Sequence, residues 1–250
     1  MQDFNLAMSE NTQLKKAPSI SVFFPCHNEE DAVEELIQKT LAALQKLTPD
    51  FEIIIVDDGS TDRTAQIADK LTVEIPQVKV VHHETNLGYG SALQSGFKAA
   101  TKELVFYTDG DAQFDIKELP PLLPLIAKYD IVSCYRINRQ EGLIRKFNAF
   151  CWTKLVCILF RLKLKDIDCA FKLFKREIFE NIKMESTGAL IDTEILARAV
   201  RKGYSITQKP VHHYPRQAGT SSGASPAVIL RAFRELFKLR KKILTENPDK

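Results

Sequence analysis

Short runs of consecutive apolar residues alternate with segments of helical periodicity in the first half of the chain. The apolar runs, each long enough for one strand, occupy 19–24, 51–56, 78–82 and 103–108. The segments between them repeat their apolar positions at helical spacing, and they occupy 29–47, 61–71 and 90–100. Because such runs are typical of strands buried on both faces, the pattern predicts a mostly parallel, Rossmann-like α/β sheet with helices on both faces.

The second half of the chain has a less regular pattern. We expect its strands and helices at 131–135, 142–165, 169–175, 192–202 and 225–244, with a hairpin or paired strands within 204–213. No stretch with the composition of a linker separates the two halves. The sequence therefore predicts a single domain.

Composition and charge exclude several classes of protein. The chain has 250 residues, of which 44% are hydrophobic and 27% are charged, as is usual for a soluble globular protein. The formal net charge of +3 does not suggest the strongly basic face of a nucleic-acid-binding domain, so no nucleic-acid partner is expected. The five cysteines are an odd number without CxxC spacing, which favours reduced thiols in a cytosolic protein.

The polarity of the chain also indicates where the protein resides. The first 16 residues lack the apolar region of a signal peptide, and no stretch reaches the roughly 18 apolar residues of a membrane span. We therefore expect a cytoplasmic protein, either free or attached peripherally to the cytoplasmic face of a membrane.

Three acidic clusters follow strands of the predicted sheet. They occupy 26–30, 57–62 and 109–113, directly after the first, second and fourth apolar runs. The carboxyl ends of parallel strands meet at one edge of a sheet, where α/β folds bind their ligands. The sequence therefore predicts that this edge carries the functional site.

Asp109, Gly110 and Asp111 are the most informative part of the third cluster. Two carboxylates that flank a small residue directly after a strand can both reach a hard cation such as Mg²⁺ or Mn²⁺. The alternative is an ordinary Asp-Gly turn that faces solvent. The apolar strand before the tripeptide and the acidic clusters at two other strand ends favour the metal.

Asp58 belongs to the second cluster. A carboxylate at a strand end can accept a hydrogen bond from a nucleobase N–H group. The alternative for this cluster is helix capping by Ser60 or Thr61. The two interpretations are compatible, with Asp58 at the base and a hydroxyl at the cap.

Four ordered motifs resemble those of one large family. Pro25-Cys-His-Asn-Glu29, Val56-Asp-Asp-Gly-Ser60, Asn86-Leu-Gly-Tyr-Gly90 and Thr108-Asp-Gly-Asp-Ala-Gln113 together resemble the inverting GT-A glycosyltransferases. With 166–173 and 213–221, the chain looks most like the branch of dolichyl-phosphate mannose synthase and bacterial polyprenyl-phosphate glycosyltransferases.

The resemblance implies a GT-A domain at 18–240, preceded by a polar tail at 1–17. Its parts would be a nucleotide-sugar half at 18–115, an acceptor half at 116–223 and a closing helix at 224–246. The resemblance also implies a reaction in which a sugar moves with inversion from a GDP- or UDP-sugar to a polyprenyl or dolichyl phosphate. Mg²⁺ or Mn²⁺ would be the cofactor.

The same resemblance assigns roles to individual residues. Those expected to contact the nucleotide-sugar are Pro25, Asn28, Glu29, Asp58, Gly88, Asp109, Gly110 and Gln113. Those expected at the metal are Asp109, Asp111 and Gln113. Arg216 would close over the donor diphosphate or the acceptor phosphate, with plain solvent exposure as the alternative. We expect Arg136 or Arg139 to help hold the acceptor phosphate.

The need for a catalytic base depends on the acceptor. In relatives that act on hydroxyl acceptors an acid near Asp192 serves as general base, and Asp168 is the competing candidate. Without the resemblance, Asp192 would be interpreted as a charge at the start of a helix. A phosphate oxygen is already ionised at neutral pH, so a phosphate acceptor largely removes the need for a base.

Cationic residues and large apolar residues share the stretch 142–165. Its cations are Arg145, Lys146, Lys154, Arg161, Lys163 and Lys165, with Phe147, Phe150 and Trp152 among them. Such a helix can lie at a membrane surface with anionic lipid heads, or it can pack on the core or on a second subunit. The resemblance favours the membrane, and the sequence leaves the oligomeric state open.

Three alternatives concern other acceptors or other classes of protein. The same donor chemistry could serve a soluble glycan or a small metabolite. A nucleotidyltransferase would be expected to have a glycine-rich phosphate loop with a lysine after the first strand, and 25–29 has neither. A binding module without activity is disfavoured because both metal-binding acids are present.

Overall fold

A seven-stranded sheet forms the centre of the computed structural model, which describes residues 17–139, 142–215 and 226–246. In sheet order its strands are β3 (Val78–His82), β2 (Phe51–Asp57), β1 (Ile20–Cys26), β4 (Leu104–Thr108), β7 (Phe171–Lys175), β5 (Ile131–Ser133) and β8 (Ile206–Thr207). A small second sheet pairs β6 (Tyr135–Ile137) with β9 (Pro210–His212). The mostly parallel α/β sheet predicted from the apolar runs is confirmed.

The strand directions change beyond β4. β1 pairs in parallel with β2 and β4, and β2 pairs in parallel with β3, whereas β7 runs antiparallel between β4 and β5. The pairing of β4 with β7 begins at Leu104 and Lys175 and carries the sheet from the first half of the chain into the second. One continuous sheet therefore joins the two halves, as expected for a single domain.

One expectation for the second half was wrong, and an alternative that the sequence left open is decided. The run 131–135 is not one strand, because Cys134 donates its N–H to Phe171 of β7, whereas Tyr135 donates to Lys209 and enters the small sheet. The segment 204–213 is not a hairpin, because β8 pairs in parallel with β5 and β9 pairs in parallel with β6. The two strands of this segment thus pair with β5 and β6, which lie about 75 residues earlier in the chain. Such long-range pairing leaves no local turn signal in the sequence.

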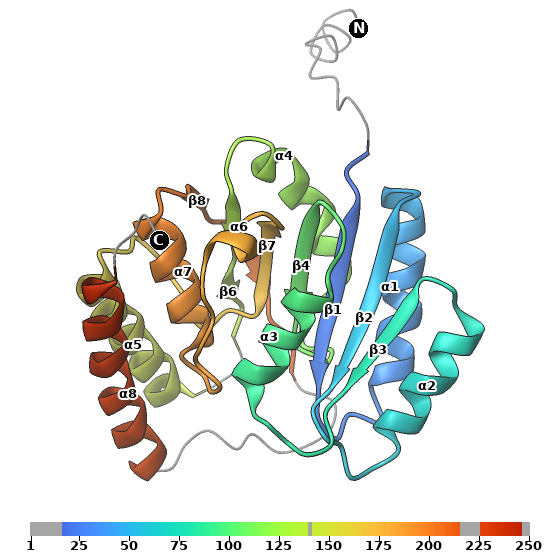
Figure 1. Ribbon diagram of the computed structural model, residues 1–250, viewed down its shortest axis with the longest axis horizontal. Helices are drawn as coiled ribbons and strands as arrows, with labels where there is room; N and C mark the ends of the chain where they lie inside the picture. Colours follow the sequence, from blue (N-terminus) through green and yellow to red (C-terminus); the bar gives the residue numbers. More distant parts are fainter. Residues whose placement is uncertain (1–16, 140–141, 216–225, 247–250) are drawn as a thin grey trace, which may run out of the picture.

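Helices cover both faces of the sheet. The longer ones are α1 (Val33–Leu47), α2 (Thr64–Glu74), α3 (Tyr89–Ala99), α5 (Leu143–Phe160), α7 (Ile191–Arg201) and α8 (Pro226–Thr245). The shorter ones are η1 (Ile116–Glu118), η2 (Pro120–Leu122), α4 (Leu123–Ile126) and α6 (Ile178–Asn181). Figure 1 shows α3 and α7 in front of the sheet and α1 behind it, where α2 packs against α1.

Aromatic rings fill the layer between α3 and the sheet. Phe23 of β1 lies edge-on to Phe97 of α3 with 4.9 Å between the ring centroids, and it stacks on Tyr107 of β4 at 5.5 Å. Phe97 also stacks on Phe179 of α6 at 3.9 Å. Burial of a large apolar side chain stabilises a fold by about 1.5–3 kcal/mol, so this layer holds α3 firmly against the strands.

α5 and α8 lie side by side at one end of the molecule (Figure 1). Trp152 of α5 packs edge-on to Phe233 of α8 with 5.6 Å between centroids, and Arg240 of α8 donates to the Leu159 carbonyl at 3.2 Å. Elsewhere α5 is exposed to solvent at large apolar residues, namely Leu143 (84%), Ile144 (79%), Phe147 (66%) and Phe150 (56%). No helix in the described part of the chain is long and apolar enough to cross a bilayer.

Candidate functional site

The carboxyl ends of β1, β2 and β4 meet at the lower edge of the sheet in Figure 1, as the sequence predicted. β1 is the central strand of the three, and its end contacts both neighbouring loops. Gly110 donates its N–H to the Pro25 carbonyl at 3.3 Å, and Glu29 donates its N–H to Thr64 Oγ1 at 2.8 Å. Pro25, Glu29 and Gly110, which the sequence assigned to one pocket, therefore lie at one edge.

Asn28 joins the loops that follow β1 and β2. Its backbone has a φ of 58°, a left-handed conformation that Asn tolerates better than most residues. Its side-chain oxygen accepts the N–H groups of Thr61 at 2.8 Å and Asp62 at 3.4 Å. Its own N–H donates to Ser60 Oγ at 3.0 Å. The expected helix cap at Ser60 or Thr61 is wrong, because α2 begins only at Thr64.

Asp58 is buried, and its carboxylate accepts hydrogen bonds from within the protein. His83 Nδ1 lies 2.7 Å from Oδ1. The N–H groups of Leu87 and Gly88 donate to Oδ1 and Oδ2 at 2.9 and 3.0 Å. Asp58 thereby fixes the turn that leads into α3 and contains Gly88. A nucleobase would have to share Oδ2 with Gly88, so the predicted contact to the base stays a prediction.

Asp57 is satisfied in the same way. Ser60 donates its N–H to Oδ1 at 3.1 Å, and His82 Nδ1 lies 2.9 Å from Oδ2. Burial by itself would raise the pKa of Asp57, but the hydrogen bonds from Ser60 and His82 outweigh it and lower the pKa. The acids at the end of β2 therefore stabilise the loops around them.

Asp109 and Asp111 follow β4 in a different environment. Burial, and then the nearby charge of Asp111, raise the pKa of Asp109 to about 7. Tyr89 at the start of α3 donates its hydroxyl to Asp109 Oδ1 at 3.0 Å, which orients the carboxylate without neutralising it. A half-buried carboxylate with a second one beside it is repelled by its neighbour, and a bound cation would offset that repulsion.

The loop around Gly110 packs directly onto the end of β1. A Cβ atom at Gly110 would lie 2.6 Å from Cys26 Sγ and 2.9 Å from the Pro25 carbonyl oxygen, so a side chain here would collide with β1. Two residues later, Ala112 has a φ of 56°, which residues with a Cβ rarely adopt. Strain of this kind gathers at functional sites, and here it shapes the acidic loop.

The oxygen atoms of this loop fit a hard divalent cation bound together with a diphosphate. In the described part of the chain no group of three or more His, Cys, Asp and Glu side chains could hold a metal alone. Mg²⁺ usually binds through one or two carboxylates and the substrate's phosphates, which matches Asp109 and Asp111. Gln113 donates its side-chain N–H to the Tyr214 carbonyl at 2.9 Å, so its predicted metal contact would use the amide oxygen.

Asp192, a candidate base, belongs to a buried ion pair. The ammonium of Lys172 on β7 is fully buried and lies 2.8 Å from Asp192 Oδ1. The same ammonium donates to the Tyr107 hydroxyl at 3.1 Å and to the Cys169 carbonyl at 2.6 Å. Tyr107 in turn donates its hydroxyl to Asp192 Oδ1. Asp192 lies in the first turn of α7, where a lysine neutralises its charge.

Asp168 lies near Asp192 but has a different balance of charge. Burial, and then the charges of Asp166 and Asp192, raise the pKa of Asp168 to about 6. A carboxylate with a pKa close to the working pH is well suited to accept a proton. Asp168, one of the two acids that the sequence offered as a base, is therefore suited to that role.

The arginines expected at an acceptor phosphate differ in their surroundings. Arg136 donates from Nε and Nη2 to the two carboxylate oxygens of Asp166 at 2.7 and 2.9 Å, and both side chains are largely buried. Arg136 thus braces the segment that carries Asp168, and a phosphate would have to compete with Asp166 for it. Arg139 is partly exposed. Arg216 lies outside the described residues, and its role stays a prediction.

Sequence reasoning missed three residues that orient these acids. Lys172 interrupts the apolar run 171–174, and a lysine in a buried strand requires a carboxylate partner, so a signal was present. The sequence analysis placed Tyr107 only in the apolar run 103–108 and Tyr89 only in the motif at 86–90. Their hydroxyl groups reach Asp192 and Asp109, contacts that local periodicity does not reveal.

Comparison with known proteins identifies the family. Residues 21–183 match the family model of glycosyl transferase family 2. Glycosyltransferase AglD of Haloferax volcanii is 32% identical over 207 residues, which are 79% of this chain and 33% of that protein. Dodecaprenyl-phosphate galacturonate synthase of Rhizobium johnstonii is 30% identical over 224 residues, which are 88% of this chain and 65% of that protein. The chain thus spans between one third and two thirds of the length of these relatives.

Solved structures confirm the fold. Glucosyl-3-phosphoglycerate synthase from Mycobacterium tuberculosis, in complex with Mn²⁺, uridine diphosphate and phosphoglyceric acid, superposes with a TM-score of 0.66. The sequences are 20% identical, and the match covers 92% of this chain and 80% of that one. The expected GT-A fold is therefore confirmed. The match to the family model over 21–183 shows that this chain belongs to glycosyl transferase family 2.

Proposed function

We propose that the protein transfers a sugar, with inversion, from a GDP- or UDP-sugar to a membrane-embedded polyprenyl phosphate. The observation that carries this proposal is the pair Asp109 and Asp111 at the edge of a GT-A sheet, where burial and mutual repulsion raise the pKa of Asp109 to about 7. A divalent cation would offset the repulsion between the two carboxylates, and the nucleoside diphosphate would supply further oxygen ligands to that cation.

The proposed reaction is a single displacement at the anomeric carbon of the sugar. An oxygen of the acceptor forms a bond to this carbon on one side while the bond to the diphosphate oxygen breaks on the other. The nucleoside diphosphate leaves with the electron pair. Bound Mg²⁺ or Mn²⁺ would act as a Lewis acid that stabilises this leaving group. Asp109 and Asp111 would hold the ion, and Tyr89 would keep Asp109 oriented toward it.

A phosphate acceptor is favoured by the buried ion pair that occupies Asp192. Attack by a hydroxyl group requires a base to remove its proton, whereas a phosphate oxygen is already ionised. Asp192 lies at the position expected for a base, yet its Oδ1 is shared by Lys172 and Tyr107. Curated relatives whose names include undecaprenyl-phosphate and dodecaprenyl-phosphate support the same class of acceptor.

The exposed apolar residues of α5 would bring the enzyme to a lipid acceptor. Leu143, Ile144, Phe147 and Phe150 face solvent beside the cations Arg145 and Lys146, which suits a surface of anionic lipid. This helix would dock peripherally on the cytoplasmic face of a membrane.

A soluble hydroxyl acceptor is the second candidate. The pKa of Asp168, raised to about 6, is the observation that favours it, because such a carboxylate can act as general base. Under this alternative the donor chemistry at Asp109 and Asp111 is unchanged.

The activity is tested by the release of nucleoside diphosphate. Purified protein is incubated with Mn²⁺ or Mg²⁺ and a panel of nucleotide-sugars, with and without polyprenyl phosphate. We expect release with one donor, dependent on polyprenyl phosphate and lost in Asp111→Asn. Release that persists in Asp111→Asn would contradict the metal site, and no turnover of any donor would contradict the enzyme.

Membrane docking is tested by flotation with vesicles that contain phosphatidylglycerol. We expect the wild type to float and the double variant Phe147→Ala, Phe150→Ala to stay at the bottom of the gradient. Val73→Ala is the matched control, because Val73 is 86% exposed on α2, away from α5. Equal flotation of all three proteins would remove the docking role of α5.

A further inference from the structure

The first turn of α3 rests on the loop that joins α6 to α7, residues 182–190. Gly90 donates its N–H to the Thr187 carbonyl at 3.0 Å. A Cβ atom at Gly90 would lie 2.3 Å from the Ser186 carbonyl oxygen, so the two backbones touch directly. Gln94, one turn further along α3, donates its side-chain N–H to the same Ser186 oxygen at 3.0 Å. Movement of the α6–α7 loop must therefore move the start of α3.

The start of α3 is part of the proposed donor site. Leu87 and Gly88 donate their N–H groups to Asp58, and Tyr89 donates its hydroxyl to Asp109. These bonds connect the second acidic cluster with the third. The α6–α7 loop consequently supports the backbone at 87–90, which links the two clusters.

A buried acid on α7 holds the α6–α7 loop in place. Glu194 has no exposed surface, and its Oε2 accepts the N–H groups of Glu185 at 3.0 Å and Ser186 at 2.7 Å. Its Oε1 receives Arg198 Nε at 2.9 Å. A buried carboxylate with these donors is compensated, and removing its charge leaves loop N–H groups and a guanidinium with fewer acceptors.

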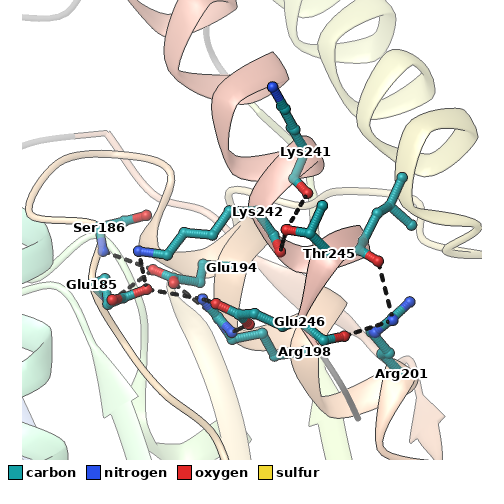
Figure 2. A network of polar contacts seen from close by, with 10 residues as sticks. Glu185, Ser186, Glu194, Arg198, Arg201, Lys241, Lys242, Thr245 and Glu246 are labelled. Atoms are coloured by element: carbon teal, nitrogen blue, oxygen red, sulfur yellow. Dashed lines mark hydrogen bonds and ion pairs between the residues drawn. The ribbon is translucent and has the colours of Figure 1, made fainter.

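The last turn of α8 completes the network (Figure 2). Arg198 Nη2 lies 3.0 Å from Glu185, and Lys242 of α8 lies 2.6 Å from the same Glu185 carboxylate. Glu246, the residue after α8, pairs with Arg198. Figure 2 shows Glu194 and Arg198 between the loop residues Glu185 and Ser186 on one side and the end of α8 on the other. The loop is therefore tied to two helices at once.

We propose that Glu194 is a positioning residue for the donor nucleotide-sugar. Its carboxylate fixes the α6–α7 loop, the loop supports the first turn of α3, and that turn orients Asp58 and Tyr89. The end of α8 strengthens the arrangement through Glu185. This inference rests on the proposed function for its kinetic consequence, but its mechanical part concerns the apo protein alone.

The mechanical part is tested by hydrogen exchange in the protein without ligand. We expect Glu194→Gln to speed exchange of the amides in 86–90 on the order of tenfold, and Glu185→Gln to do so by a smaller factor. Glu185 is partly exposed, so its variant keeps the proposal testable if Glu194→Gln fails to fold. Arg201→Ala is the control, because among the described residues Arg201 bonds at this junction only to the carbonyls of Leu244 in α8 and of Glu246 just after it.

The kinetic part is tested by a split between the two substrates. In Glu194→Gln and Glu185→Gln we expect the KM for the nucleotide-sugar, and the Kd for GDP or UDP with Mn²⁺ measured by calorimetry, to rise on the order of tenfold. The KM for the acceptor should stay within about twofold. A general loss of stability would raise the KM for both substrates, and the same rise would appear in Arg201→Ala.

The outcomes separate this inference from the proposed function. Unchanged exchange at 86–90 in both glutamate variants, or equal acceleration in Arg201→Ala, overturns the positioning role. A rise in the acceptor KM equal to that of the donor overturns it as well. If the wild type binds neither GDP nor UDP, the proposed function fails, and the exchange measurement still decides whether Glu194 supports α3.

Discussion

The acids at the end of β2 and those at the end of β4 are neighbours on one sheet edge, yet they are built differently. Asp57 and Asp58 receive imidazole and backbone donors, and the pKa of Asp57 is lowered. Asp109 is half-buried beside Asp111, and desolvation and the charge of Asp111 raise its pKa to about 7. Hydrogen bonds outweigh the effect of burial on the pKa of Asp57, whereas the pKa of Asp109 stays raised although Tyr89 donates to its carboxylate.

This difference separates acids that stabilise the fold from acids that would bind a ligand, although both kinds follow strands of the same sheet. A carboxylate whose oxygens are filled by the protein stabilises the fold and fixes loops. A carboxylate that repels its neighbour lowers the stability of the metal-free protein, and a bound cation offsets that repulsion. Mutations at the two strand ends should therefore have opposite balances of activity and stability.

The largest effect is expected for Asp109→Asn. Loss of a metal ligand should lower turnover by about a thousandfold, because the charge on the leaving group is no longer offset. The melting temperature of the metal-free variant should be equal to or higher than that of the wild type, since the repulsion with Asp111 is gone. Initial rates and thermal scans in EDTA check both parts. A marked drop in the metal-free melting temperature would contradict the comparison.

The ion pair of Asp192 should be the most sensitive to loss of a single charge. Asp192→Asn leaves Lys172 buried without its counter-charge, which should lower the free energy of unfolding by about 3–5 kcal/mol, measured by urea titration. Asp168→Asn serves as the matched variant and should leave stability unchanged or increase it. With a phosphate acceptor, Asp168→Asn should change turnover by less than about tenfold. A loss of about a hundredfold or more would instead favour the hydroxyl acceptor.

A smaller effect is expected for Asp58→Asn. Its amide cannot accept from His83, Leu87 and Gly88 as the carboxylate does, so the free energy of unfolding should fall by about 1–3 kcal/mol. The KM for the donor should rise while the Kd for Mn²⁺ with diphosphate changes little. Urea titration and donor kinetics measure the two parts. An unchanged free energy of unfolding in Asp58→Asn would show that Asp58 does not stabilise the loops at the end of β2 as we infer.

The smallest effect is a pH dependence that differs between the two environments. Because the pKa of Asp109 is raised from 3.8 to about 7 on folding, the native state binds the extra proton, and this group's contribution to stability falls as the pH rises through that window. Glu52 at the start of β2 is the opposite case. Burial would raise its pKa, but hydrogen bonds from Lys79, Ser21 and Thr101 outweigh it and lower the pKa from 4.5 to about 2.

The stabilisation from Glu52 is therefore complete above pH 4.5 and is lost as the pH falls toward 2. Melting temperatures of the metal-free protein between pH 3 and 8 should be flattened at the upper end by Asp109→Asn and at the lower end by Glu52→Gln. If both variants flatten the same end, the assignment of the two environments is wrong.

The sequence predicted the parallel half of the fold because its information is local. Each of β1 to β4 is an apolar run, and an acidic cluster after three of them fixes the site at one edge. The second half depends on partners far along the chain. The antiparallel β7, the break at Cys134 and the separate partners of β8 and β9 are all decided by such pairings.

The candidate site was predictable to the same extent. Asp109 and Asp111 could be found from their spacing after a strand, whereas the ion pairs of Asp192 and Arg136 could not. Each of these is set by a buried partner, Lys172 or Asp166, that lies on another segment of the chain. Residue type and spacing indicate which groups reach a site, but the charge on each group depends on the final packing.

The antiparallel position of β7 also bears on the order in which the protein is synthesised. β1 to β4 are complete at residue 108, long before the ribosome reaches Phe171–Lys175. Until then β4 is an edge strand, and its free backbone groups can pair with other chains. The acidic loop is therefore synthesised while β4 is still at the edge of an incomplete sheet. β4 acquires its second neighbouring strand only when β7 emerges and pairs with it.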